Sequence, residues 1–171
     1  MADLATLRDL RDRLANATGP DRRLDHDLMA LSYVKGERSI GTMEDDGTGW
    51  RPCTDFVWID PETNRWKTTA RDGFEYTASI DAAVALCTRV LPGWMWRIAQ
   101  CSVSDDASVE PDFNHPIYGA ELQRVFGDDA MRGFFDVYPG CDIDQRPPGQ
   151  PALALCRAIV GGLIAQEEAN G

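Results

Sequence analysis

The chain has 171 residues, and 43% of them are hydrophobic, which is enough apolar material to bury a real core in one domain. Its 28 acidic and 17 basic residues give a net charge of −11 at pH 7. Such an acidic chain is not expected to bind a bare nucleic-acid backbone or an anionic membrane surface, because both require clustered Lys and Arg.

The first 31 residues predict a helical hairpin. Leucines recur at intervals of three and four between Leu4 and Ala17, which places them on one face of a helix. Gly19-Pro20 interrupts this pattern, and Pro is well placed in the first turn of a new helix. The second helix is expected over Asp21–Leu31, where leucines again share one face.

The amino-acid composition changes in residues 36–73, which are rich in glycine, charged residues and β-forming residues. The β-formers of Phe56–Ile59 and Arg65–Thr69 flank the polar turn Asp60–Asn64, which predicts a β-hairpin. Residues 44–49 are expected to form a loop. This loop does not resemble a phosphate-binding loop, because it contains no Lys.

A third helix is expected to start after Ser79, which is a good N-cap, and to stop at Leu91-Pro92-Gly93. A strand is predicted over Trp94–Val103, where large apolar side chains alternate with polar ones. Two weaker β-like segments follow, at Ile117–Phe126 and Gly133–Tyr138.

The last predicted helix starts near Pro151 and runs to Ala169. It is apolar nearly all round until Gln166, so it is expected to be packed on more than one side. Gly161-Gly162 lowers its helix propensity by about 1 kcal/mol per Gly relative to Ala, which a close contact with a neighbouring element would offset.

This order of elements predicts an α+β fold with a mainly antiparallel sheet packed by helices, similar to an α-β-α sandwich. One domain is expected over residues 1–171, with a helical hairpin at 1–31, a β-hairpin insert at 36–73 and a helix-strands-helix core at 76–169. The five cysteines are widely spaced and include no CxxC pair, and the N-terminus has no apolar signal region. A cytoplasmic location is therefore expected.

The segments YTASIDAAVALC with LPGWMWRI, PALALCRAIVGGLIA, and GPDRRLDHDLMAL resemble a family of small phage and prophage proteins of unassigned function, the phage α-β-α sandwich domain family. The resemblance covers about half of the chain, and its motifs are mainly structural. It implies a phage or prophage accessory protein in a bacterial host, a setting in which host takeover and counter-defence are common. It implies no catalytic residues.

A search for catalytic motifs finds none of the common hydrolase, metalloprotease, nucleotide-binding or kinase patterns. His26 is expected on an exposed helix face. His115 has Asp112 as its one near acidic neighbour, which is not enough for an acid–base or metal site. We therefore expect a protein that is not an enzyme and that uses neither a metal nor a cofactor.

Acidic residues concentrate between Ser104 and Asp144, which contains ten acidic residues but only two basic ones, Arg124 and Arg132. This stretch favours a protein partner with a basic surface, and a counter-defence inhibitor of the anti-CRISPR kind is the leading hypothesis. The alternative is a set of solvated loops and strand edges that only keeps the protein soluble. The candidate contact residues are Asp105, Asp106, Glu110, Asp112, Asp128 and Asp129.

Aromatic residues gather in the central part of the chain and suggest a second hypothesis, a binder that sequesters a nucleotide signal. Its candidate ligand residues are Trp58, Trp66, Arg71, Tyr76 and Ser79, with a phosphate near the helix N-terminus at Ser79. Alternatively, these Trp side chains fill the core between sheet and helices. A virion or morphogenesis component that assembles through the helical hairpin is a further possibility. The oligomeric state is left open.

Overall fold

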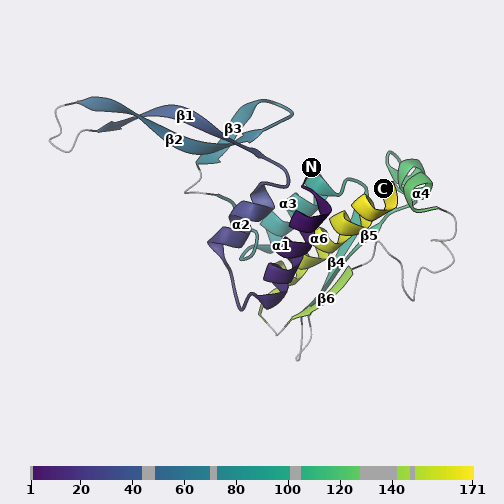
Figure 1. Ribbon diagram of the computed structural model, residues 1–171. Helices are drawn as coiled ribbons and strands as arrows, with labels where there is room; N and C mark the ends of the chain where they lie inside the picture. Colours follow the sequence, from purple (N-terminus) through teal and green to yellow (C-terminus); the bar gives the residue numbers. More distant parts are fainter. Residues whose placement is uncertain (1, 44–48, 70–72, 101–104, 128–141, 147–148) are drawn as a thin grey trace.

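The computed structural model describes residues 2–43, 49–69, 73–100, 105–127, 142–146 and 149–171. These residues form two parts, shown in Figure 1. One part, here called the body, contains the helices and one three-stranded sheet. The other part is a second three-stranded sheet that projects from the body, and we call it the arm (residues 34–43 and 49–69).

The predicted helical hairpin is present. Helix α1 spans Leu4–Asn16 and begins at the N-cap Asp3, whose carboxylate accepts a hydrogen bond from the Thr6 amide (2.8 Å). Helix α2 spans Arg22–Met29 and is capped in the same way by Asp21. Each helix buries its leucine face, as the spacing predicts.

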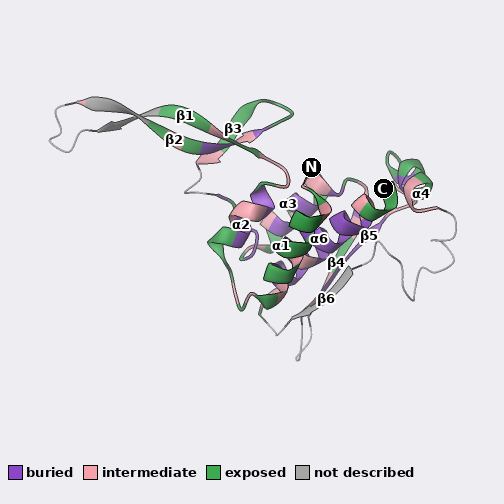
Figure 2. Ribbon diagram, viewed as in Figure 1, coloured by how far each residue is buried: buried purple, intermediate pink, exposed green. Residues whose placement is uncertain are grey.

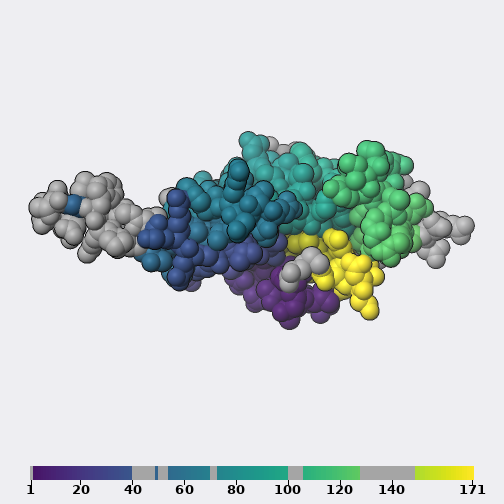
Figure 3. Space-filling model, turned by 90° about the horizontal axis from the view of Figure 1, so that it is seen from above, coloured from purple at the N-terminus to yellow at the C-terminus, as the bar shows by residue number. Residues whose placement is uncertain are grey.

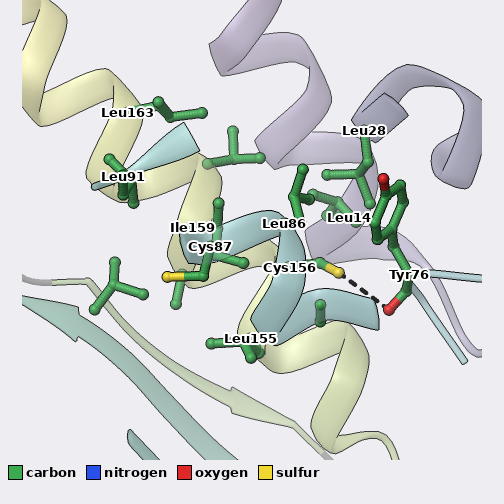
Figure 4. Packing of buried hydrophobic residues seen from close by; sticks show 14 of the residues in the cluster. Leu14, Leu28, Tyr76, Leu86, Cys87, Leu91, Leu155, Cys156, Ile159 and Leu163 are labelled. Atoms are coloured by element: carbon green, nitrogen blue, oxygen red, sulfur yellow. Dashed lines mark hydrogen bonds between the residues drawn. The ribbon is translucent and has the colours of Figure 1, made fainter. Parts of the chain in front are cut away.

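Helix α6, Pro151–Asn170, forms the centre of the body. Its residues from Ala152 to Ala165 are buried, apart from the half-buried Arg157. One side of α6 packs on α1 and on α3 (Ile80–Val90), and the other side packs on the sheet of the body (Figures 1 and 4). The apolar side chains of α6 are therefore buried on both sides of the helix. The predicted packing of this helix on more than one side is confirmed.

The sheet of the body has the order β4-β5-β6, and all of its pairs are antiparallel. Its strands are β4 (Trp94–Gln100), β5 (Asp105–Pro111) and β6 (Asp142–Arg146). The sequence predicted β4 but not β5 or β6. The weak strand expected at Gly133–Tyr138 lies outside the described residues.

The prediction of a strand at Ile117–Phe126 is wrong, because Gly119–Phe126 forms helix α4. Tertiary contacts decide the outcome: Leu122 is buried in the core, and the Phe126 ring packs edge-on against Trp94, with 5.6 Å between ring centroids. Gly119 lets the start of this helix approach the Phe113 carbonyl, since a Cβ there would lie 2.4 Å from that oxygen.

The arm contains the predicted β-hairpin, formed by β2 (Trp50–Asp60) and β3 (Arg65–Thr69). The sequence did not predict β1 (Val34–Met43), which pairs with the whole length of β2. Most of the loop predicted at residues 44–49 lies outside the described residues. Figure 2 shows that buried residues concentrate in the body, whereas most described arm residues are exposed or intermediate.

The α+β class with antiparallel pairing is therefore confirmed, with strands divided between two sheets. The sheet of the body supports α6, and the arm lies beyond α2 and α3 (Figure 1). The arm and α4 occupy opposite ends of an elongated molecule (Figure 3).

Candidate functional site

A cavity of about 490 Å³ lies where the N-termini of α3 and α6 meet. It is lined by Pro20, residues 77–81 and residues 149–153, and each of these comes from a segment that carries the phage resemblance or directly precedes one. Among the described lining residues, Asp81 is the one charged side chain. An anion in the cavity would therefore meet a carboxylate rather than a cation, which is unfavourable for the phosphate that we expected near Ser79.

A buried hydrogen-bond network lies beside this cavity. The Asp25 carboxylate is 2% exposed and accepts bonds from the Thr77 amide (2.7 Å) and hydroxyl (2.9 Å). The same hydroxyl accepts a bond from the Asp21 amide (3.0 Å). Burial raises the pKa of Asp25, while the bonds from Thr77 and the charge of Arg22 oppose the shift. This network joins α2 to the segment before α3.

Of the described members of the predicted ligand set, only Ser79 lines the cavity. Tyr76 and Trp58 are 3% and 5% exposed and belong to the hydrophobic core, and the Tyr76 carbonyl accepts a bond from the Cys156 thiol (3.3 Å; Figure 4). Trp66 lies on the arm and is 51% exposed. Ser79 lines the cavity, but its hydroxyl caps α3 by accepting a bond from the Ala82 amide (3.3 Å).

Arg71, the remaining member of that set, lies outside the described residues. The expected rim of stacking aromatic residues is thus not formed by the described members of the set. The reading of Trp58 and Tyr76 as ligand contacts is corrected: both are core residues, in line with the alternative that the central aromatic residues fill the interior.

The described candidate contact residues of the acidic stretch lie in β5 and in the turn after it. Glu110 is 9% exposed and lies 3.6 Å from the Arg97 guanidinium. The Asp112 carboxylate accepts a bond from the Asn114 amide (2.9 Å), which closes the turn. Asp106 is half-buried. Glu110 and Asp112 thus have structural roles. Asp128 and Asp129 lie outside the described residues, and of Asp105 the structure describes the backbone, in β5.

His115 also has a structural role. Its Nδ1 atom accepts bonds from the amides of Ile117 and Tyr118, each at 3.2 Å, and its ring contacts the Tyr118 ring. The imidazole therefore organises the turn that leads into α4. His26 packs edge-on against Trp58 with 6.2 Å between ring centroids.

On one face of the arm, an arginine and a tryptophan stack across the middle strand. The Arg38 guanidinium carbon lies 4.6 Å from the Trp66 ring centroid. Arg38 pairs with Asp55 and Trp66 pairs with Ile59, so the two side chains meet across β2 above Val57. Val57 is 2% exposed, as expected if the stacked pair covers it. We call this face the Trp66 face.

The Trp66 face is further packed by Ile59, whose side chain lies over Gly36. A Cβ at Gly36 would lie 2.4 Å from the Ile59 Cδ1 atom, so no larger residue fits without a shift. On the opposite face, the Lys35 ammonium lies 4.5 Å from the Phe56 ring centroid. The arm thus has a small apolar layer of its own, and each of its faces carries a cation over an aromatic ring.

The base of the arm is fixed to the body. The Arg89 guanidinium, on α3, donates to the Asp60 carboxylate at the end of β2 (2.8 Å) and stacks over the Tyr33 ring (4.5 Å). Trp58 reaches from β2 into the core. The hydrogen bond and charge of Arg89 lower the pKa of Asp60. These contacts hold the arm in a fixed position where it leaves the body.

The arm also carries much of the exposed apolar surface of the described residues. Val34, Phe56 and Trp66 are 56%, 49% and 51% exposed. Sequence reasoning selected Trp66 but not Val34, Phe56, Lys35 or Arg38. One signal was available: Lys35 and Lys67 are the two lysines of the chain, and both belong to the arm.

Comparison with protein-family models, with curated proteins and with solved structures finds no match to this chain. The phage resemblance therefore stays a prediction. In the described part of the chain, no helix has both the length and the apolar character to cross a membrane. Within the same ranges, no group of three or more His, Cys, Asp and Glu side chains is arranged to hold a metal ion.

Proposed function

We propose that this is a non-enzymatic binding protein that recognises another protein with its arm. The observation that carries the proposal is the exposure of Phe56 and Trp66, each beneath a cation, on a sheet that projects from the body (Figures 1 and 3). Tryptophan and arginine are the residue types most enriched where interfaces gain their binding energy.

The contacts within the arm and at its base support this function. Arg38 and Trp66 hold each other in place across β2, and Asp60 and Trp58 fix the base to the body. Side chains that are already ordered lose less conformational entropy when a partner binds, so more of the contact energy appears as affinity.

The phage-like motifs favour a protein of the bacterial host as the partner, and inhibition of a host defence protein is the role that we propose on that basis. A basic partner for the acidic stretch from Ser104 to Asp144 remains a separate prediction. The nucleotide hypothesis has lost its main argument, because Trp58 and Tyr76 lie in the core.

Site-specific photo-crosslinking tests the arm as the interface. A photoreactive phenylalanine analogue replaces Trp66 or Phe56 in the full chain, and the protein is irradiated in cells of the bacterial host. Ile117 is the matched control, because it is apolar and 76% exposed but lies in the body. Trp66 and Phe56 lie on opposite faces of the arm, so we expect a heterologous adduct from at least one of them, the same adduct from both only if the partner contacts both faces, and none from Ile117.

Other outcomes of this experiment would contradict the proposal. Adducts that form from Ile117 but not from the arm would place the interface on the body. An adduct of twice the mass of the chain would indicate self-assembly, which the virion or morphogenesis hypothesis predicts.

A further inference from the structure

Strand β4 forms one edge of the sheet of the body. The strand order is β4-β5-β6, so in the described part of the chain β4 pairs with β5 on one side and with no strand on the other. Trp96 is 42% exposed, and Arg97 and Ala99 are exposed as well, whereas the described side chains of β5 are buried or half-buried. Within the same ranges, residues 95–99 form no backbone hydrogen bond outside the ladder with β5. The outer amide and carbonyl groups of β4 are therefore open to another strand.

The other edge strands of the described sheets, β1, β3 and β6, each carry more than one charged residue. Charges on an edge strand oppose its pairing with another chain. In β4, Arg97 is the one charged residue, and its guanidinium lies 3.6 Å from the Glu110 carboxylate of the same chain. Strand β4 thus lacks the protection that the other edges have. The charged residues of those edges are Lys35, Glu37 and Arg38 in β1, Arg65 and Lys67 in β3, and Asp142, Asp144 and Arg146 in β6.

The sequence of β4 is complementary to itself in one antiparallel register. When a two-fold axis passes at Trp96, this residue lies opposite its own copy, and Trp94 lies opposite Ile98. Met95 then lies opposite Arg97, so the thioether meets the aliphatic part of the arginine. Trp94 and Ile98 pack against the core on the side of α6, so the apolar face of one sheet continues into that of the other. Directly opposed side chains on one face are the pairs that stabilise a sheet.

Charge favours this register over the neighbouring one. An axis at Arg97 would place two guanidinium groups opposite each other, which destabilises a strand pair. With the axis at Trp96, the nearest charged side chains of the described sheet are Arg97 and Glu110, the cross-strand partner of Met95. These two charges lie 3.6 Å apart within each copy and balance each other. The net charge of −11 is therefore not concentrated where the two strands would meet.

We propose that β4 pairs with β4 of a second copy of this chain, in the antiparallel register centred on Trp96. The sheets of the two bodies then form one continuous antiparallel sheet. The contact uses the same surface on both copies, so it closes at two copies and does not continue into a filament. The arm projects away from the sheet of the body (Figure 1), so both arms stay accessible in the pair. This inference is independent of the proposed function of the arm.

A second copy fits this edge better than an extended segment of a different protein. Edge strands do pair with foreign segments, but such a segment must bring side chains that match both faces of the strand. Strand β4 supplies this match itself, with apolar residues opposite Trp94, Trp96 and Ile98 and an aliphatic one opposite the stem of Arg97.

The mass of the full chain in solution tests the pairing. Light scattering after size-exclusion chromatography should show a mass that rises from one chain to two between micromolar and millimolar concentration. Trp96→Lys would place two ammonium groups opposite each other, so we expect its pairing to be at least tenfold weaker. Trp66→Lys makes the same change at the exposed tryptophan of the arm, and its mass should rise as in the natural chain. Circular dichroism checks that both variants are folded.

Disulfide formation tests the register, and it does so even if Trp96→Lys does not fold. In Trp96→Cys the two introduced thiols are directly opposed, with Cα atoms about 4.5–5.5 Å apart, a distance that a disulfide spans. In Arg97→Cys they are diagonal, at about 7–8 Å, which is too far. After air oxidation, we expect a disulfide-linked pair on a non-reducing gel from Trp96→Cys, and from Arg97→Cys only the background that the five natural cysteines give in the unaltered chain.

Four results would overturn the inference. The first is a natural chain that keeps the mass of one copy at every concentration. The second is pairing that is lost in Trp66→Lys but kept in Trp96→Lys, which would place self-assembly on the arm. The third is equal disulfide formation from Trp96→Cys and Arg97→Cys. The fourth is a photoreactive phenylalanine analogue at position 96 that captures a different protein and no second copy, which would make β4 the site of a foreign strand.

Discussion

Helix α6 packs tightly against three side chains at Gly162, and replacing this glycine by alanine tests the packing of the body. A Cβ at Gly162 would lie 2.9 Å from Val109 Cγ2, 3.0 Å from Leu91 Cδ1 and 3.1 Å from Trp94 Cζ3. Optimal separations between carbon atoms are about 3.5–4.0 Å, so one methyl group would overlap three side chains at once.

Two opposing effects set the size of the change. Alanine is about 1 kcal/mol better than glycine in the interior of a helix. Extra atoms in a well-packed core destabilise by about 1–3 kcal/mol. Val109 and Leu91 are fully buried and Trp94 is 8% exposed. A branched Val side chain and a rigid indole ring cannot easily move away from an added methyl group. We therefore take the upper part of that range and expect a net loss of about 1–2 kcal/mol in the free energy of unfolding.

Urea unfolding followed by far-ultraviolet circular dichroism measures this change, because it does not depend on Trp94 fluorescence. The midpoint should fall while the slope stays constant, which reports a loss of stability without a change in compactness. Gly19→Ala is the control, since nothing lies within 4 Å of its Cβ position, and we expect no loss there. If Gly162→Ala is as stable as the natural chain, the close packing of α6 is not a constraint and the reasoning is refuted.

Three further changes probe other parts of the fold. Asp25→Ala should lower the free energy of unfolding by about 1–3 kcal/mol, because the buried Thr77 amide loses its acceptor, and Asp25→Asn should lower it less in the same urea assay. Arg89 lowers the pKa of Asp60 below its ordinary value of 3.8. The stability contributed by this pair is therefore fully present above pH 3.8 and is lost as the pH falls through the lowered pKa. Arg89→Gln should remove this loss of stability from an acid titration of the free energy of unfolding. Gly36→Ala should speed hydrogen exchange of the arm amides, since its Cβ would lie 2.4 Å from an isoleucine methyl group, and unchanged exchange would contradict the tight packing of the arm.

Four helices, α1, α2, α3 and α6, were well predicted because their signals are local. The N-cap Ser79 and the apolar periodicity after it define α3, and the continuous apolar run after Pro151 defines α6. Each signal lies within a few residues of the element that it specifies, so no knowledge of the tertiary structure was needed.

Strand β1 was missed for a physical reason. Its sequence, Val34–Met43, is polar and shows no clear alternation, since the arm projects into solvent and neither face of this strand is packed by the body. It is held by pairing with β2, which a sequence pattern does not reveal. At residues 117–126 a strand was predicted where the structure has a helix. β-forming side chains there pack in the core as part of α4.

The candidate site was only partly predictable. Trp58 and Trp66 look alike in the sequence, but one is buried and the other exposed. The hairpin register explains the difference: Asp60 pairs with Arg65, so Trp66 pairs with Ile59 and lies on the face opposite Trp58. Working out this register from the four-residue turn would have separated the two tryptophans. The stacking of Arg38 on Trp66 could not have been found, because it depends on β1.

The two parts of the molecule differ in how far apart along the chain their contacts lie. Every strand pairing of the arm falls within residues 34–69, whereas the Arg8–Glu168 pair between α1 and α6 spans 160 positions. During synthesis at about 5–20 residues per second, the arm is complete roughly 5–20 s before α6 follows. The local strand pairings of the arm can form in that interval, whereas the leucine faces of α1 and α2 stay uncovered until α6 has been synthesised. The proposed recognition element is thus made before the scaffold that carries it, and a nascent chain could meet its partner before the body has folded.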